Sequence, residues 1–284
     1  MTRSDRKVYV SGSTGFLGKQ VSKHLLDLGY SVVLGGKNPV ELNKLIDGLI
    51  LSYGELVSGK VVCDLSNPDE WEGGIKQLLA HELYGYVNCS GIQGRIASIS
   101  ELDVDEYTRV FNVNLFSPIF FTKNLLDQSA GSPISIIHFS GGGSTGARSF
   151  FAPYSLSKTA LVRFVENVAL ENQSVAIKIN AVAPGVMPSK MQEQILQAYI
   201  LDGSTEQEAA SKSMAAISES NSQVLSLVSF LLSEASTGIT GKLISAKWDN
   251  WKEWPNHLSE LQSTGLYTLR RMTARDLGHT WGDI

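Results

Sequence analysis

A glycine-rich turn between a strand and a helix constrains the fold of this chain more than any other feature. Residues 8–18 read VYVSGSTGFLG, with glycines at intervals of three. Gly12 permits a tight turn, Gly15 lets the backbone approach a pyrophosphate, and Gly18 lets the helix pack closely on the sheet. Free N–H groups at the start of the following helix favour phosphate. The turn therefore predicts nucleotide contacts from Gly12, Ser13, Thr14, Gly15, Phe16, Leu17 and Gly18.

Apolar runs of strand length alternate with longer helical patterns through most of the sequence. The expected strands are residues 7–11, 31–35, 60–63, 85–88, 134–139, 176–182 and 241–245. The expected helices are residues 17–28, 40–52, 68–81, 105–128, 153–171 and 223–234. This alternation is typical of a parallel sheet covered on both faces. We expect an α/β fold: a single-domain, Rossmann-type, doubly wound parallel sheet of about seven strands with helices on both faces.

Composition narrows the possible partners. A net charge of -4 and a pI near 5.8 give no electrostatic reason to expect nucleic acid. No apolar run approaches the roughly 18 residues that span a bilayer, and the N-terminus has no signal-peptide core. Cys63 and Cys89 could form a redox pair, but small buried side chains in a reducing compartment are favoured. We expect a cytoplasmic protein without nucleic-acid or membrane partners, and no Cys/His spacing suits a metal site.

Tyr154 and Lys158 are four residues apart in an expected helix, so their side chains share one face. An ammonium close to a phenol favours the phenolate and lowers the pKa of the phenol. Such a phenol can exchange a proton with a substrate oxygen. Ser140 supplies a hydroxyl at the end of an expected strand upstream. The same spacing also arises by chance on solvated helix faces, so the surrounding motifs decide its meaning.

The end of the second expected strand bears on the choice between the two nicotinamide cofactors. An acid there would bind the adenosine ribose 2′-hydroxyl, whereas a cation would suit a 2′-phosphate. The chain has Lys37 at this point and no carboxylate, and Ser13 could add a hydrogen bond to the same phosphate. A plain surface lysine is the alternative interpretation. NADP(H) is therefore the preferred cofactor, with NAD(H) as the other possibility.

With these motifs in order, the sequence resembles a short-chain dehydrogenase/reductase from the first expected strand to the last. Asp64, followed by Leu65, resembles the aspartate that contacts the adenine amino group. The segment from Asn88 to Gly91 is similar to the family's Asn-Asn-Ala-Gly element, which lines the cofactor. Asn114 matches the helix asparagine that organises a water-linked proton relay. Further matches on the nicotinamide side are Pro184, Gly185, Val186 and Ser189.

The resemblance implies a catalytic role for four side chains. Tyr154 would act as general acid in carbonyl reduction and as general base in alcohol oxidation. Lys158 would bind the nicotinamide ribose and hold down the pKa of the phenol. Ser140 would donate a hydrogen bond to the carbonyl oxygen as negative charge develops. Asn114 would hold the water chain of the lysine.

Two departures from the family pattern leave alternatives open. The G-x-x-G-x-x-G spacing is that of the extended branch, whereas the length of the chain resembles the compact oxidoreductase branch. Ser140 lies one residue further from Tyr154 than the usual serine, and Gly141 holds the usual spacing. Ser144 is the alternative to Ser140. His138 could suggest a Ser-His pair, but a buried core histidine is favoured because no acid completes a triad.

The function that the resemblance implies is an NAD(P)-dependent oxidoreductase that interconverts a carbonyl and a secondary alcohol by hydride transfer. A nucleotide-sugar epimerase or dehydratase of the same superfamily is the alternative, since the glycine spacing fits it. A non-catalytic NADP(H)-binding protein is a second alternative. The expected partner is a small carbonyl or alcohol substrate, with a sugar, polyol or nucleotide sugar as our hypothesis for its class. We expect a homodimer or homotetramer.

Two regions fall outside the strand–helix alternation. Within a domain of residues 1–246, the family pattern implies that residues 186–220 form a substrate lid, although their apolar stripe could equally serve packing. Residues 247–284 form a tail expected to pack on the same domain or on a neighbouring subunit. Its tryptophans and Arg270 and Arg271 suit either a substrate or a subunit contact. Arg148 is a further candidate for an anionic substrate group, and a solvated loop arginine is the alternative.

Overall fold

Seven parallel strands form one sheet in this computed structural model, which describes residues 2–129, 132–172, 177–215, 219–279 and 281. Their order across the sheet is β3-β2-β1-β4-β5-β6-β7. The strands are β1 (Lys7–Ser11), β2 (Ser31–Gly36), β3 (Val57–Val62), β4 (Gly85–Asn88), β5 (Ile134–Phe139), β6 (Ile177–Ala183) and β7 (Leu243–Ser245). All six pairings are parallel within the described residues, which confirms the expected doubly wound sheet. Position 176, expected to open the sixth strand, lies outside the described residues.

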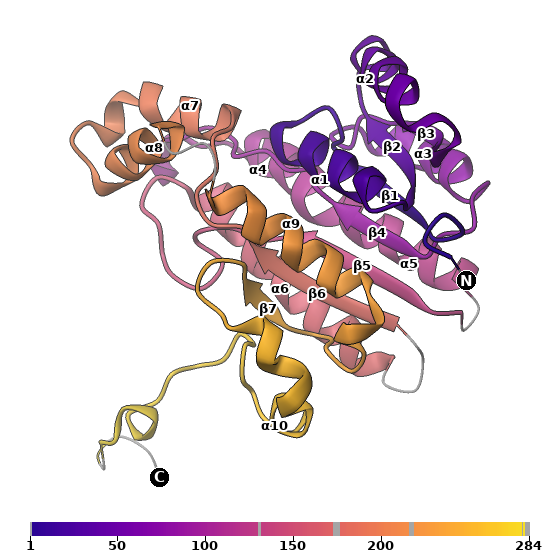
Figure 1. Cartoon of the computed structure of the whole chain (residues 1–284). Helices are drawn as coiled ribbons and strands as arrows, with labels where there is room; N and C mark the ends of the chain where they lie inside the picture. The colour runs from indigo at the N-terminus through magenta and orange to yellow at the C-terminus, as the bar shows by residue number, and fades with distance from the viewer. Residues whose placement is uncertain (1, 130–131, 173–176, 216–218, 280, 282–284) are drawn as a thin grey trace.

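Helices cover both faces of the sheet (Figure 1). One face carries α1 (Phe16–Asp27), α2 (Pro39–Tyr53) and α9 (Glu219–Leu232). The other carries α3 (Trp71–Leu78), α5 (Ser117–Ser129) and α6 (Ala152–Glu171). Short 3-10 turns, η1 (Gly54–Leu56), η2 (Pro68–Glu70), η3 (Ile99–Glu101) and η6 (Glu234–Ser236), lie between these elements.

Alternation along the strands divides the core into two layers. Successive strand residues point to opposite faces of a sheet. Val8 and Val10 pack in the layer with α1 and α9, whereas Tyr9 between them packs in the layer with α5 and α6. All three are at most 2% exposed. Strands buried on both faces explain why the sequence shows continuous apolar runs.

The strand order places the carboxyl ends of β1 and β4 beside a crevice. After β1 the chain adds β2 and β3 on one side, and then returns to place β4 on the other. The connections on either side of β1 therefore diverge, and ligands of open α/β sheets bind at such a switch point.

A π-helical segment interrupts the single helix that the sequence predicted over residues 105–128. The structure has α4 (Val104–Phe111), the π-helical η4 (Asn112–Phe116) and then α5. The hydrogen bonds of a π-helical segment span one residue more than those of an α-helix, and such segments occur often at functional sites. Here it contains Asn114, whose side chain is fully buried.

The segment after β6 forms a helical projection beside the carboxyl edge of the sheet (Figure 1). It contains α7 (Lys190–Gln197), η5 (Tyr199–Leu201) and α8 (Thr205–Ala215). Ile195, Leu201 and Ala210 pack on Phe151, the residue immediately before α6. This small third core attaches the segment to the helix that carries Tyr154 and Lys158.

The first part of the tail packs beside β7 through η7 (Trp251–His257) and α10 (Leu258–Ser263), and the later part with η8 (Arg275–Leu277) extends away from the sheet (Figure 1). Trp251 and Trp254 are buried in the core layer of α1 and α9. The Leu243 N–H of β7 donates to the Tyr267 carbonyl at 2.8 Å. The tail therefore contacts the strand at the edge of the sheet.

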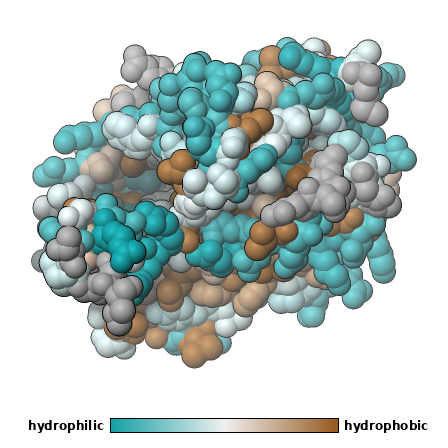
Figure 2. Space-filling view, turned by 90° about the horizontal axis from the view of Figure 1, so that it is seen from below, coloured by the Kyte–Doolittle hydropathy of each residue, from teal (hydrophilic) through white to brown (hydrophobic). Residues whose placement is uncertain are grey.

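Surface hydropathy is mixed on the face drawn in Figure 2, where small hydrophobic patches lie among hydrophilic residues. Within the described residues, the structure holds no helix that is both long and apolar enough to cross a membrane.

Candidate active site

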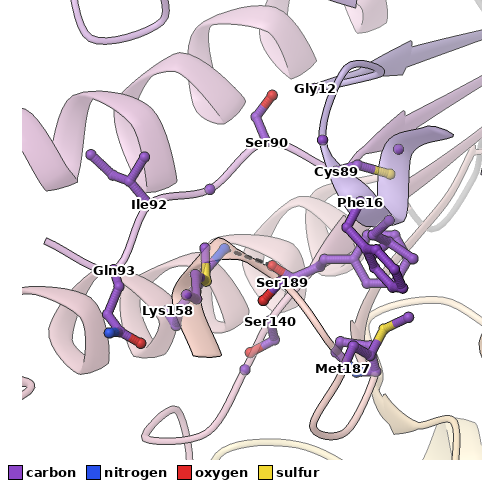
Figure 3. Close-up of a pocket in the computed structure, with 18 of the residues that line it drawn as sticks. Gly12, Phe16, Cys89, Ser90, Ile92, Gln93, Ser140, Lys158, Met187 and Ser189 are labelled. Carbon is purple, nitrogen blue, oxygen red and sulfur yellow. Dashed lines mark hydrogen bonds between the residues drawn. The ribbon is translucent and has the colours of Figure 1, made fainter. Parts of the chain in front are cut away.

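A cavity of about 1680 Å³ lies at the carboxyl edge of the sheet and extends from the glycine turn to α6. Figure 3 shows part of its wall, with Gly12 and Phe16 toward one end and Lys158 and Ser140 toward the other. Most of the residues predicted from the sequence line this one cavity. They are Gly12, Thr14, Gly15, Phe16, Leu17, Gly18, Lys37, Asp64, Leu65, Gly91, Ser140, Tyr154, Lys158, Pro184, Gly185, Val186 and Ser189.

The glycine turn has the geometry of a phosphate cradle. Gly12 has a φ of +65°, which favours glycine, and a Cβ on Gly18 would lie 2.1 Å from the Gly12 carbonyl oxygen. Helix α1 begins after Gly15 with no side-chain cap. Its first N–H groups are therefore left for an anion, at the positive end of the helix dipole. These residues fit a dinucleotide pyrophosphate.

Ser13 is the first correction to the sequence prediction. Its hydroxyl donates to the Val10 carbonyl at 2.6 Å and accepts from the Gly35 N–H at 3.2 Å, and the residue is fully buried. Its own N–H donates to the Gly35 carbonyl at 2.8 Å. Ser13 thus fastens β1 to β2 and does not line the cavity, so its side chain cannot add a hydrogen bond to a 2′-phosphate.

Asn88 is the second correction, because its side chain lies beneath the cavity and not in its wall. Its amide oxygen accepts from the Ser11 hydroxyl at 2.7 Å, and its amide nitrogen lies 3.2 Å from His138 Nδ1. His138 Nε2 lies 3.1 Å from the Thr122 hydroxyl. Asn88 therefore joins three central strands, and His138 is a core histidine as the sequence analysis favoured.

Asn114 also lies outside the wall of the cavity. Its amide oxygen accepts from the Ile92 N–H at 2.9 Å, and its amide nitrogen donates to the Ile92 carbonyl at 2.8 Å and to the Ser157 hydroxyl at 3.0 Å. The side chain therefore holds the segment after β4 against α6. In this structure its side chain thus positions the segment that carries Gly91 and Gln93, both of which line the cavity.

Tyr154 and Lys158 lie on the same face of α6, as their spacing predicted. The Lys158 ammonium is 5.9 Å from the centre of the Tyr154 ring and donates to the Phe139 carbonyl at 2.8 Å. Burial lowers the pKa of Lys158 to about 8. Burial also raises the pKa of Tyr154, while Arg148 acts in the opposite direction.

The pKa of this phenol lies above its ordinary value, opposite to the lowering that the sequence predicted. The loss of hydration on burial disfavours the phenolate, and this effect outweighs the opposite effect of Arg148. The ammonium is directed at the Phe139 carbonyl, which takes up one of its hydrogen bonds.

Gly141 lies directly against the Tyr154 hydroxyl. A Cβ at residue 141 would be 2.1 Å from that oxygen, closer than any real contact allows. The residue with the usual serine spacing thus leaves room for the phenol. Ser140 and Ser144 both line the cavity, and the Ser140 hydroxyl is buried with no hydrogen-bond partner in the described part of the chain.

A pattern described as enoyl-(acyl carrier protein) reductase, from the short-chain dehydrogenase/reductases, matches residues 14–246. The chain belongs to the short-chain dehydrogenase/reductase family. Members of this family are oxidoreductases that bind nicotinamide cofactors. The cradle at Gly12 and the buried pair Tyr154 and Lys158 fit such a cofactor within one cavity.

Relatives of this short-chain dehydrogenase/reductase include named reductases. Versicolorin reductase of Emericella nidulans is 28% identical over 85% of this chain and 94% of its own length. A diacetyl reductase that forms (S)-acetoin, from Staphylococcus epidermidis, is 27% identical over 83% of this chain and 94% of its own. A solved short-chain dehydrogenase from Escherichia coli, complexed with NADPH, has a TM-score of 0.72 at 20% identity and covers 86% of this chain and 97% of that one.

Two features of this short-chain dehydrogenase/reductase were missed by the sequence analysis. Gln93 is 4% exposed and lines the cavity, and its amide nitrogen has no partner among the described residues. Arg148, considered for a substrate anion, instead forms a two-point ion pair with Glu206 at 2.8 and 2.6 Å. Nothing local in the sequence marks either feature, because both depend on contacts between distant segments.

The apolar stripe within residues 186–220 and the tail contribute unevenly to the cavity. Met187 and Ile195 are buried and line it, whereas Tyr199 is 87% exposed and does not. From the tail, Trp248 and Tyr267 line the cavity. Arg270, which the sequence suggested for a substrate or a subunit contact, forms an ion pair with Asp276.

Proposed function

We propose that this protein is an NADP(H)-dependent oxidoreductase that interconverts a carbonyl and a secondary alcohol. The observation that carries the proposal is the meeting of the Tyr154 phenol, the Lys158 ammonium and the glycine turn in one cavity. The turn from Gly12 to Gly18 would hold the pyrophosphate and Lys158 would hold the nicotinamide ribose. When bound, the cofactor supplies the hydride.

Tyr154 is the proton donor in carbonyl reduction. Because burial raises the pKa of its phenol, Tyr154 is protonated at neutral pH. A protonated phenol can give its proton to the carbonyl oxygen as negative charge develops there. The same oxygen would take the proton back in alcohol oxidation.

Ser140 supports the same carbonyl oxygen with a hydrogen bond. Its buried hydroxyl has no partner in the described residues, and an unpaired buried donor adds strength to a bond formed with a developing negative charge. Ser144, on the loop that follows, is the alternative donor.

Lys37 supports the preference for NADP(H). It follows β2 directly, lines the cavity and keeps 71% of its side chain exposed. Its ammonium lies 3.8 Å from Asp64, and an ion pair this exposed is weak. The lysine is thus free to turn toward a 2′-phosphate, and the NADPH bound to the Escherichia coli neighbour agrees with this preference.

The substrate is a small carbonyl compound. The cavity is large enough for a dinucleotide and a further organic molecule, and the relatives named above include a diacetyl reductase. A sugar or polyol, the substrate class inferred from the sequence, shares with diacetyl the presence of a second oxygen near the reacting carbon.

The replacement of Tyr154 by phenylalanine tests the proposal. Tyr154→Phe removes the proton donor and should lower kcat by about 10²- to 10⁴-fold while NADPH affinity changes little. The measurements are ketone-dependent NADPH consumption and NADPH binding by fluorescence. Tyr199→Phe, at an exposed residue outside the cavity, is the matched control. Retention of normal turnover by Tyr154→Phe would rule out this mechanism.

A further inference from the structure

Gln93 is a buried polar side chain that no part of the proposed reaction uses. It lies in the segment after β4, is 4% exposed, and leaves its amide nitrogen without a partner in the described part of the chain. A buried donor without a hydrogen bond is costly, and native proteins rarely keep one without a functional reason. Gln93 also lines the cavity. The missing partner is therefore expected to be a ligand atom.

The backbone on both sides of Gln93 is held in place. The Asn114 amide forms two hydrogen bonds with Ile92, at 2.9 and 2.8 Å. Gly94 has a φ of +77°, and a Cβ there would lie 2.6 Å from the Val110 side chain. The glutamine thus projects from a rigid support, which lowers the entropy that it would lose on binding.

Gln93 lies at the catalytic end of the cavity. In Figure 3 it is on the side of Lys158 and Ser140, away from the Gly12 turn. A Cβ on Gly91 would lie 3.5 Å from the Lys158 ammonium, and Gln93 is only two residues further along. Two residues span at most about 7 Å. Gln93, Lys158 and Tyr154 therefore line the same cavity, with Gln93 at the end that holds Lys158.

We propose that Gln93 binds a second oxygen of the substrate, close to the reacting carbonyl. An amide N–H donates to a carbonyl, hydroxyl or ether oxygen. The reacting oxygen already has Tyr154 and a serine hydroxyl, so the amide is available for another acceptor. The substrate class is then dicarbonyl, hydroxycarbonyl or polyhydroxy compounds, in preference to simple ketones. This inference rests on the proposed function and refines its substrate.

Matched pairs of ketones test this role. Butane-2,3-dione is paired with butan-2-one, and 1,2-diphenylethanedione with 1,2-diphenylethanone, so each pair differs by one oxygen. The measurement is kcat/KM with NADPH for the natural protein, Gln93→Leu and the control Gln194→Leu, whose glutamine is exposed on α7 outside the cavity. Dicarbonyls are intrinsically more reactive, so the decisive quantity is the change in the ratio within a pair on substitution, in which that reactivity cancels.

We expect Gln93→Leu to lower the ratio of dicarbonyl to monocarbonyl kcat/KM by about tenfold or more in at least one pair, since a donor to the second oxygen is lost. Gln194→Leu should leave the ratio unchanged. The thermal midpoint and the NADPH affinity of Gln93→Leu should not fall, because the amide nitrogen has no partner to lose within the described residues.

Three results would overturn the inference. An equal loss of kcat/KM for both members of each pair, or a lower thermal midpoint, would show a structural role for Gln93. An unchanged kcat/KM for all four ketones would show that the amide contacts no second oxygen. If the natural protein neither turned over nor bound any of the four ketones with NADPH or NADH, the proposed function itself would fall. The first two results leave the proposed function intact.

Discussion

At the scale of single residues, the site depends on how close the Tyr154 hydroxyl lies to Gly141. A serine at residue 141 would match the usual spacing of the family, but the phenol oxygen already occupies the place that its Cβ needs. The absence of a side chain at Gly141 therefore permits the observed position of the proton donor. The serine hydroxyls that can assist it come from the neighbouring Ser140 and Ser144.

A serine introduced at residue 141 should therefore lower the turnover of the enzyme. Gly141→Ser places a Cβ 2.1 Å from the phenol oxygen and must displace it. A displacement of about 1 Å can lower turnover by about 10²-fold. The measurement is kcat with the best ketone found for the natural protein. Gly146→Ser is the control, because a Cβ there meets no atom within 4 Å. Activity equal to or above that of the natural protein would contradict this explanation.

Lys37 belongs to the same scale. Binding titrations should show NADPH tighter than NADH, and Lys37→Ala should remove most of the difference, about tenfold, because one charge-assisted contact to a 2′-phosphate is lost. Lys44→Ala, an exposed lysine on α2 outside the cavity, is the control. Equal affinities for the two cofactors in the natural protein would reject the NADP(H) preference.

At the scale of elements, an ion pair joins α8 to the loop before α6. The Arg148 guanidinium makes two hydrogen bonds to the Glu206 carboxylate and stacks 3.8 Å from the centre of the Phe151 ring. Phe151 in turn contacts the small core under α7 and α8. The helical projection is thus fastened to the element that carries Tyr154. Arg148 forms this contact and also supplies a positive charge that acts on the Tyr154 phenol.

Two substitutions should separate these effects. Glu206→Gln weakens the ion pair but keeps the positive charge, so KM should rise about five- to tenfold with little change in the pH profile.

Arg148→Met removes the charge that lowers the pKa of Tyr154, so that pKa should rise. Alcohol oxidation needs the phenolate, and its rate should then increase only at higher pH than in the natural protein. The measurement is kcat/KM for oxidation against pH, and a shift of Arg148→Met to lower pH would contradict the assignment.

At the scale of the whole molecule, hydrophobic layers cover both faces of the sheet, and polar side chains are buried at its centre. His138 is one of them, fully buried between Asn88 and Thr122. The tail adds Trp251 and Trp254 to one layer and contacts the edge strand β7. The cavity therefore lies at the edge of a sheet that is packed on both faces. The segments outside the strand–helix alternation, residues 186–220 and the tail, contribute residues to its wall.

Stability should fall on acidification because of His138. Burial, with a smaller contribution from Lys158, lowers its pKa from 6.5 to about 3. Between these values the unfolded chain binds more protons than the folded one, so the free energy of unfolding decreases as pH falls, by up to about 1.4 kcal/mol per pH unit. Urea unfolding between pH 7 and pH 4 measures this. His138→Gln should show a shallower dependence, and the exposed His257→Gln should not; equal slopes in all three would exclude His138 as the cause.

The sequence by itself determined the strand–helix order, the glycine turn and the pairing of Tyr154 with Lys158. Each follows from a local rule: strand burial on both faces gives apolar runs, a close helix–strand approach needs Gly18, and a spacing of four aligns side chains on a helix. Such rules act between near neighbours and can be read from one chain.

Only the tertiary structure decided which side chains face the cavity. Ser13, Asn88 and Asn114 carry suitable groups at the predicted positions, yet their hydrogen bonds are taken by the surrounding backbone and core. Whether a side chain at the end of a strand points into the cavity or into the core depends on neighbours far away in sequence. Two further features arise in the same way, from packing between segments that no local pattern connects. They are the Gln93 amide nitrogen, without a partner among the described residues, and the ion pair of Arg148 with Glu206.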